Sequence, residues 1–64
     1  MENELLKQIW KYVSQFDFIV MFTSKDVEIK KGLLLCLASK DYLFYCKDKD
    51  SFILTESGLA VAKQ

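Results

Sequence analysis

The C-terminal part of the chain contains the sequence DYLFYCKDKDSFILTESGLAVAK, residues 41–63, which predicts a hairpin followed by a helix. Apolar and aromatic residues fill Tyr42–Cys46 and Phe52–Leu54, as is typical of short strands. The residues between them, Lys47–Ser51, are charged or polar and predict a turn. Because this turn lacks the Asn-Gly or Asp-Gly pair of a tight hairpin, we expect a looser loop of about four residues.

The second strand is predicted to lead directly into a final helix. Thr55 can act as the N-cap, because its hydroxyl oxygen can accept a hydrogen bond from a backbone N–H of the first turn. Leu54, which precedes the cap, can pack on the fourth helical residue, Leu59, as a hydrophobic staple. We therefore expect a strand, a charged tip, a strand and a capped helix in that order.

At the other end of the chain, the sequence predicts a helix over Glu2–Gln15. Acidic Glu2 and Glu4 in the first turn complement the helix dipole. Trp10 belongs to the apolar face, whereas Tyr12 is expected at the surface, where it is available to a partner subunit. The apolar residues recur at steps of three and four, which places them on one face: Leu5, Leu6, Ile9, Trp10 and Val13.

The next segment, Phe16–Phe22, has the sequence FDFIVMF and is expected to form a short buried strand. Its aromatic and β-branched residues and its length favour a strand over a helix, although so short a run has no decisive periodicity. We expect residues 18–22 to pair with the hairpin and to complete a three-stranded sheet.

The middle of the chain contains either one helix or two. Thr23 can cap a helix, with Asp26 three residues later as the acidic partner of a capping box. One helix could run over Lys25–Ala38, but an internal Gly32 lowers its stability by about 1 kcal/mol relative to alanine. Gly32 could instead mark the turn between a very short helix and a second one that starts at Leu33. In the single helix, the buried stripe would be Val27, Leu33, Leu34 and Leu37, and Glu28, Lys30 and Lys31 would face outward.

The composition predicts one folded domain over residues 1–64. The hydrophobic content of 52% is high enough for a dense core in so small a chain. Nine lysines balance nine acidic residues, and the sequence contains no arginine. A domain that binds nucleic acid usually has a basic excess, so the neutral balance weakens that function without excluding it.

The sequence also bears on location and on the cysteines. The first residues are acidic and amphipathic, unlike a signal peptide, and the longest apolar runs, 18–22 and 33–38, are far too short to span a bilayer. We therefore expect a cytoplasmic protein with no membrane partner. Cys36 and Cys46 do not form a C-x-x-C motif, and both are expected to be buried, reduced thiols.

Enzymatic and metal chemistry has no candidate residues in this sequence. The chain contains no histidine, so the commonest general base and the commonest zinc ligand are both missing. Residues 48–50, Asp-Lys-Asp, resemble the start of a calcium loop, but Ile53 and Leu59 stand where that loop requires glycine and glutamate. Two separate glycines cannot build a phosphate-binding loop. We therefore expect no catalytic residue, no metal and no cofactor.

The remaining candidate chemistry is electrostatic and belongs to lysines around the middle helix and the hairpin tip. If both lie on one side of the molecule, their ammonium groups could straddle a phosphate backbone, with hydroxyl contacts from Thr23, Ser24 and Ser39. Alternatively, they are solubilising lysines that nearby acidic residues offset. The candidate DNA-binding residues are Lys25, Lys30, Lys31, Lys40, Lys47 and Lys49.

Four aromatic residues lie on the predicted hairpin: Tyr42, Phe44, Tyr45 and Phe52. They could form a stacking platform for single-stranded nucleic acid. Aromatic residues on the strands of so small a domain more often belong to its core, and we expect that role here.

Taken together, these elements resemble small winged helix-turn-helix DNA-binding proteins of the phage and prokaryotic regulator type. The resemblance covers residues 22–62: leucines at helical spacing, a polar break, a strand, a tip, a strand and the turn Leu54–Gly58 into the last helix. It implies an α+β fold, a winged-helix-like domain of helices with a C-terminal β-hairpin and a short final helix. The chain between Thr23 and Tyr42 is short for two ordinary helices, so the first helix of the pair is about one turn long or is missing.

The resemblance also implies a role for particular lysines. Lys30 and Lys31 would contact DNA from the recognition helix, and Lys47 and Lys49 would hold adjacent phosphate from the wing. Our first hypothesis is therefore a transcription regulator of phage or plasmid type that binds double-stranded DNA.

Two hypotheses about partners accompany this one. A homodimer would double the number of phosphate contacts and bury surplus apolar surface such as Ile19, Met21 or Leu35. The alternative function is a winged-helix-like protein–protein interaction module that does not bind DNA, which the neutral charge and the missing arginine favour.

Overall fold

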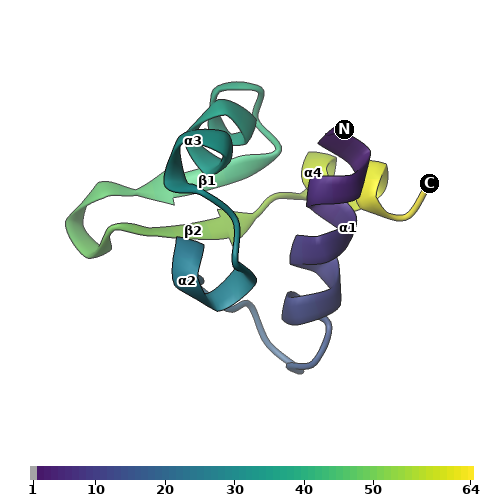
Figure 1. Cartoon of the computed structure of the whole chain (residues 1–64). Coiled ribbons are helices and arrows are strands. Elements are labelled where there is room, and N and C mark those ends of the chain that lie inside the picture. Colours follow the sequence, from purple (N-terminus) through teal and green to yellow (C-terminus); the bar gives the residue numbers. More distant parts are fainter. Residues whose placement is uncertain (1) are drawn as a thin grey trace.

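A computed structural model describes residues 2–64 and shows an α+β fold, in which four helices pack around a two-stranded antiparallel sheet (Figure 1). This arrangement confirms the predicted α+β class. None of the helices within residues 2–64 is long and apolar enough to cross a membrane. The helices are α1 (Glu2–Val13), α2 (Ser24–Val27), α3 (Lys31–Ser39) and α4 (Glu56–Ala62), and the strands are β1 (Leu43–Cys46) and β2 (Ser51–Leu54).

The predicted hairpin forms with the expected loop length. Strands β1 and β2 pair antiparallel, and β1 begins one residue later than predicted. The loop has four residues: a 3-10 turn η1 (Lys47–Lys49) and then Asp50, which adopts the left-handed conformation with a φ of 48°. An aspartate is among the few residues other than glycine that adopt this conformation without a large steric cost.

The N-cap predicted for the final helix is confirmed. The hydroxyl oxygen of Thr55 accepts a hydrogen bond from the backbone N–H of Gly58 at 3.1 Å. The same hydroxyl donates to the carbonyl oxygen of Asp41 at 2.6 Å. One side chain therefore starts α4 and also ties it to the turn that leads into β1.

Gly58 is required because α4 lies very close to the chain that enters β1. A Cβ atom at this position would lie 2.1 Å from the carbonyl oxygen of Tyr42 and 2.8 Å from a methyl group of Leu54. Leu54 and Leu59, the predicted staple pair, both line one hollow beside this helix.

Helix α1 forms as predicted and ends two residues earlier. Its Leu6 and Ile9 are fully buried, and Trp10 is half-buried against the core. Tyr12, for which the sequence predicts a surface position, is also half-buried, because it packs against the core and its ring centroid lies 5.5 Å from that of Phe16. Helix α1 packs against α4, so the two ends of the described chain lie together (Figure 1).

The strand predicted over Phe16–Phe22 is wrong. The chain turns at the end of α1, where the N–H of Phe16 bonds to the carbonyl oxygen of Val13 at 3.1 Å, and residues 16–19 are exposed. The segment reaches the outer edge of β2 only at Phe22, which forms an isolated bridge with Phe52. The sheet within residues 2–64 therefore has two strands and one bridge, rather than the predicted three strands.

The middle of the chain contains two helices, and the first is a single turn. Thr23 and Asp26 form the predicted capping box at the start of α2. Glu28 ends that helix in the left-handed conformation, with a φ of 57°. Helix α3 starts two residues before the predicted Leu33, so Gly32 lies in its first turn and not between the helices. Within the predicted stripe, Leu34 and Leu37 are buried, but Leu33 is 41% exposed.

The core draws on every helix and both strands. Phe22 and Phe52 are its largest fully buried side chains, and their rings stack with centroids 6.1 Å apart. The core role predicted for the hairpin aromatics holds for Phe52, whereas Phe44 points outward and is 60% exposed. Tyr42 and Tyr45 are half-buried and pack against the core, which consists of Leu6, Ile9, Phe22, Val27, Ile29, Leu34, Leu37, Leu43, Phe52 and Ala62.

The prediction of two buried thiols is wrong for Cys36. Cys36 lies on the outer face of α3 and is exposed, because the buried face of that helix is taken by Leu34 and Leu37. Cys46, at the end of β1, is half-buried, and both cysteines are free thiols.

Substitution of the two glycines tests this packing. Gly58→Ala is expected to lower the free energy of unfolding by about 2 kcal/mol or more, because the new methyl group would overlap backbone atoms that cannot move independently. The matched control is Gly32→Ala, where no atom beyond the adjacent residues and the helix backbone itself lies within 4 Å of the new Cβ. This variant is expected to raise the same free energy by about 0.5–1 kcal/mol. Urea denaturation followed by circular dichroism measures both, and equal effects would contradict the packing described here.

Candidate nucleic-acid interface

A cleft of about 280 Å³ opens between the start of α2, the start of α3 and the tip of the hairpin. In Figure 1 this tip extends away from α1 and α4, on the side of the molecule that carries α2 and α3. The cleft combines basic and hydroxyl side chains with one carboxylate and one aromatic ring. Its lining residues are Thr23, Ser24, Lys25, Lys31, Lys49, Asp50 and Phe52.

The bridge between Phe22 and Phe52 places α2 at this cleft. The N–H of Phe22 bonds to the carbonyl oxygen of Phe52 at 2.9 Å, and the reverse bond measures 2.8 Å. Thr23 follows directly, and its backbone N–H donates to the Asp26 carboxylate at 2.9 Å while its hydroxyl oxygen accepts from the N–H of Asp26. The hydroxyl hydrogen of Thr23 is thereby left to donate to a ligand in the cleft.

The hairpin tip is held to α3 by an ion pair. The Nζ atom of Lys31 lies 2.7 Å from Oδ1 of Asp50, and the hydroxyl of Tyr45 donates to the same oxygen at 2.9 Å. The Lys31 ammonium also lies 5.7 Å from the centre of the Tyr45 ring, within the range of a cation–π contact. Three side chains from α3, β1 and the loop therefore meet at one carboxylate.

These contacts change the acidity of both charged groups. The hydrogen bond to Asp50 raises the pKa of the Lys31 ammonium above its usual 10.5. The hydrogen bonds from Lys31 and, secondly, from Tyr45 lower the pKa of the Asp50 carboxyl below its usual 3.8. Both groups face solvent, so the pair guides the position of the loop more than it stabilises the fold.

The structure brings together three of the six candidate lysines. Lys25, Lys31 and Lys49 line the cleft. Lys30 and Lys47 are exposed and lie close in sequence to cleft residues, but they do not line the cleft. Lys40 is at the opposite end of α3, where its ammonium pairs with the Glu2 carboxylate. Within residues 2–64, Lys31 and Lys40 are the only two of the six that form ion pairs.

The chemistry that this cleft supports is the binding of an anion. Ammonium and hydroxyl groups are donors that proteins use for phosphate oxygens. The Phe52 ring, which also lines the cleft, contributes no polar group. The described residues contain no group of three side chains able to hold a metal ion.

The Asp50 carboxylate opposes anion binding and competes for Lys31. The sequence alone does not predict this pairing, since no local motif joins position 50 to position 31. It depends on the four-residue loop and the strand register, which bring Asp50 back to α3.

The outer face of α3 does not add polar groups suited to base recognition. Leu33 and Leu35 are 41% and 39% exposed, and Cys36 is also exposed. Specific contacts to base edges in DNA are usually made by arginine, lysine, asparagine or glutamine side chains. The described residues around the cleft thus provide donors for an anion, whereas the outer face of α3 provides few groups that could contact base edges.

Comparison of the chain with protein-family models, curated proteins and solved structures finds no match. The proposed function therefore depends on the cleft and on the arrangement of elements around it.

An NMR titration of the Asp50 carboxyl tests the ion pair. A carboxyl with a lowered pKa contributes stability that is present above the pKa of the unfolded chain and is lost as the pH falls through the folded value. In Lys31→Met, the titration midpoint of Asp50 is expected to rise towards 3.8, because the first cause of its lowered pKa is removed. The control variant Lys25→Met removes a cleft lysine that does not pair with Asp50. The Asp50 carboxyl should titrate in this variant as it does in the unsubstituted chain. A midpoint that stays the same in Lys31→Met would contradict the pair.

Proposed function

We propose that this chain is a minimal winged-helix protein that binds double-stranded DNA and acts as a cytoplasmic transcription regulator. In this proposal α2 and α3 are the helix-turn-helix pair, the hairpin is the wing, and the cleft between them holds the phosphate backbone. The observation that carries the proposal is that Lys25, Lys31 and Lys49 line one cleft although they come from three separate elements.

The order of elements supports this assignment. A helix, a one-turn helix, a longer helix, a hairpin and a final helix follow one another along the chain. The one-turn α2 accounts for the short chain between Thr23 and Tyr42, because both helices of the proposed pair fit into it. The wing tip lies against the start of α3 through the Lys31–Asp50 contact, so both proposed DNA-binding elements border the same cleft.

The composition of the cleft predicts electrostatic and weakly selective binding. Three ammonium groups that neutralise phosphates would release about three counterions, which gives a slope of log Kobs against log salt of about −3. The apolar outer face of α3 provides few groups for base edges, so affinity should depend little on DNA sequence.

A second candidate function is recognition of another protein without any DNA binding. The exposed leucines of α3 favour it, because they occupy the face that the first proposal directs towards DNA. Duplex binding at low salt distinguishes the two functions. A protein that recognises only a protein partner through these leucines would not bind a DNA duplex under that condition.

A fluorescence anisotropy titration with a labelled DNA duplex tests the proposal. The variant Lys25→Ala/Lys49→Ala is expected to reduce the salt slope by about two, because each lost phosphate contact removes about one. The control variant Lys7→Ala/Lys11→Ala removes the same charge from the exposed surface of α1, and it should leave the slope near that of the unsubstituted chain. Absence of duplex binding at low salt would reject DNA binding, and equal losses in both variants would reject the cleft as the site.

Neutralising the carboxylate of the cleft should have the opposite effect. Two unit charges about 4 Å apart in water interact by about 1 kcal/mol, so Asp50→Asn is expected to tighten duplex binding at low salt by roughly fivefold. Asp48→Asn changes the net charge equally from a residue of η1 that does not line the cleft, and it should have a smaller effect. If both variants bind equally well, the proposed competition between Asp50 and phosphate is wrong.

A further inference from the structure

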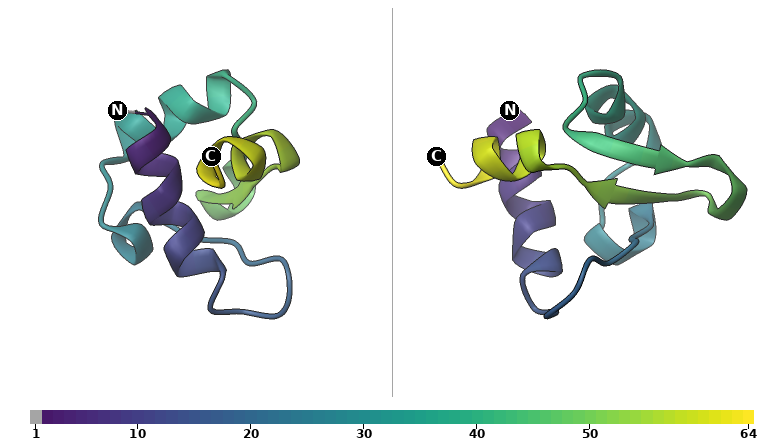
Figure 2. Two further views of the ribbon diagram at one scale, coloured as in Figure 1. Left: turned by 90° about the vertical axis from the view of Figure 1, so that its right-hand side faces the viewer. Right: turned by 180° about the vertical axis from the view of Figure 1, so that it is seen from behind.

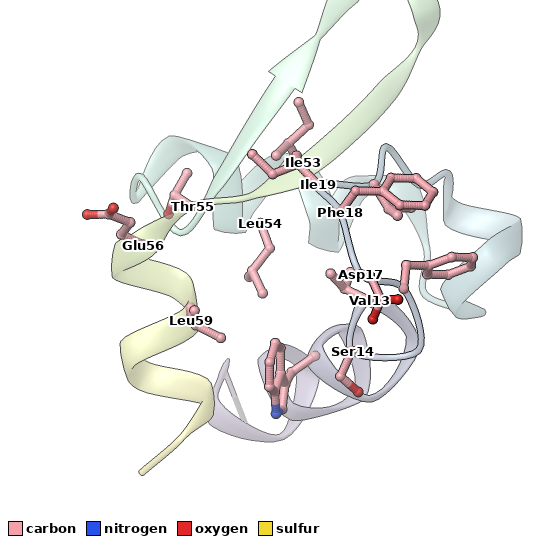
Figure 3. A pocket seen from close by; sticks show the side chains of 13 residues that line it. Val13, Ser14, Asp17, Phe18, Ile19, Ile53, Leu54, Thr55, Glu56 and Leu59 are labelled. Carbon is pink, nitrogen blue, oxygen red and sulfur yellow. The ribbon is translucent and has the colours of Figure 1, made fainter.

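A second and larger hollow lies on another part of the molecule. It has a volume of about 460 Å³ and is bounded by the end of α1, the segment after α1, the end of β2 and the start of α4. Figure 3 shows Leu54, Leu59 and Val13 around its centre and Ile19 and Phe18 at its edge. We refer to the space between Trp10, Val13, Leu54 and Leu59 as the apolar groove.

The edge of the apolar groove carries the most exposed large apolar side chains of residues 2–64. Ile19 is 80% exposed and Phe18 is 70% exposed. Both belong to the segment between α1 and α2, which stands out from the rest of the chain (Figure 2). A large apolar side chain exposed to this extent next to an apolar hollow is typical of an interaction site.

We propose that the apolar groove binds a second copy of this chain in a two-fold symmetric dimer, with Ile19 of each copy seated in the groove of the other. A two-fold interface uses the same patch on both subunits, so that patch must contain both a projecting group and a place to receive it. Ile19 provides the first and the groove between Trp10 and Leu59 provides the second, on one face of the chain.

The charges around the apolar groove are also self-complementary. The carboxylates of Asp17 and Glu56 are among its lining residues. The ammonium of Lys63 does not line the groove but lies 5.5 Å from the centre of the ring of Trp10, which does, so a cation is also close to this surface. A second copy brings both signs of charge to a patch that has both signs, whereas a uniformly basic or acidic partner would meet a like charge.

The proposed dimer contact and the basic cleft use different side chains. The residues that line the cleft and those that line the hollow do not overlap. A dimer through the apolar groove would therefore use side chains other than those that line the cleft. Dimerisation through this apolar surface does not depend on DNA binding.

Sedimentation equilibrium over protein concentrations from about 1 µM to about 1 mM tests the proposal. The unsubstituted chain is expected to form a reversible dimer, and Ile19→Asp is expected to raise its dissociation constant at least about tenfold, because a charge replaces the apolar group in the partner's groove. Leu35→Asp is the matched control, since it places the same charge at an exposed leucine of α3 outside the hollow, and it should leave the dimer intact. A reducing agent prevents disulfide-linked dimers through the exposed Cys36.

A mixed sample of isotope-labelled and unlabelled chain identifies the contact directly. Intermolecular NOEs between the Ile19 methyl groups and the Trp10 ring are expected. A monomer at every concentration would overturn the proposal, as would a dimer that Ile19→Asp does not weaken. A monomer whose groove signals shift when an amphipathic peptide is added would also overturn it, and would assign the groove to a different partner. Circular dichroism spectra that match among the variants show that each is folded.

Discussion

The contact between Phe22 and Phe52 fixes how the two halves of this chain meet. It combines two backbone hydrogen bonds with the stacking of two fully buried rings. Residues before Phe22 belong to α1 and the exposed segment that follows it, and residues after it form α2 and α3. A single bridged residue therefore replaces a third strand, and it brings the start of α2 to the edge of the hairpin. Because Thr23 directly follows Phe22, this contact sets where Thr23 and Ser24 lie relative to the hairpin.

The electrostatic character of the cleft arises from arrangement and not from net charge. The chain has equal numbers of basic and acidic residues. Its fold gathers three lysines around the cleft and places a single carboxylate, that of Asp50, among them. Because Tyr45 and Lys31 both bond to this carboxylate, it also positions the loop that carries Lys49. The same group thus shapes the cleft and reduces its attraction for anions.

Much of the fold could be predicted because local interactions determine it. The apolar spacing of α1, the loop length of the hairpin and the cap at Thr55 all depend on residues close together in the sequence. The capping box at Thr23 belongs to the same group, and it indicates the start of α2 although not its length. The prediction of a buried Leu33 is wrong because helical spacing alone cannot distinguish which of two adjacent leucines faces the core.

The errors arise where distant parts of the chain compete. Phe16–Phe22 has the composition of a strand, but the turn at the end of α1 directs it outward until it reaches β2. A buried Cys36 is the usual expectation for a free cysteine, whereas α3 already fills its inner face with leucines. The lysines of the cleft can be named from the sequence, but which of them converge depends on the hairpin register. Lys40 belongs to the same predicted set and instead lies beside Glu2.

The shortness of α2 has a dynamic consequence. A helix of four residues is far below the length that persists alone in water, so α2 depends on tertiary contacts. Val27 is buried in the core, and the side-chain amide of Gln8 donates a hydrogen bond to the Val27 carbonyl oxygen at 2.6 Å. Amide hydrogens of this turn should therefore exchange with solvent through local opening, at a lower free energy than those of α1 or the sheet. Since Ser24 and Lys25 lie in this turn, occupation of the cleft would slow that exchange.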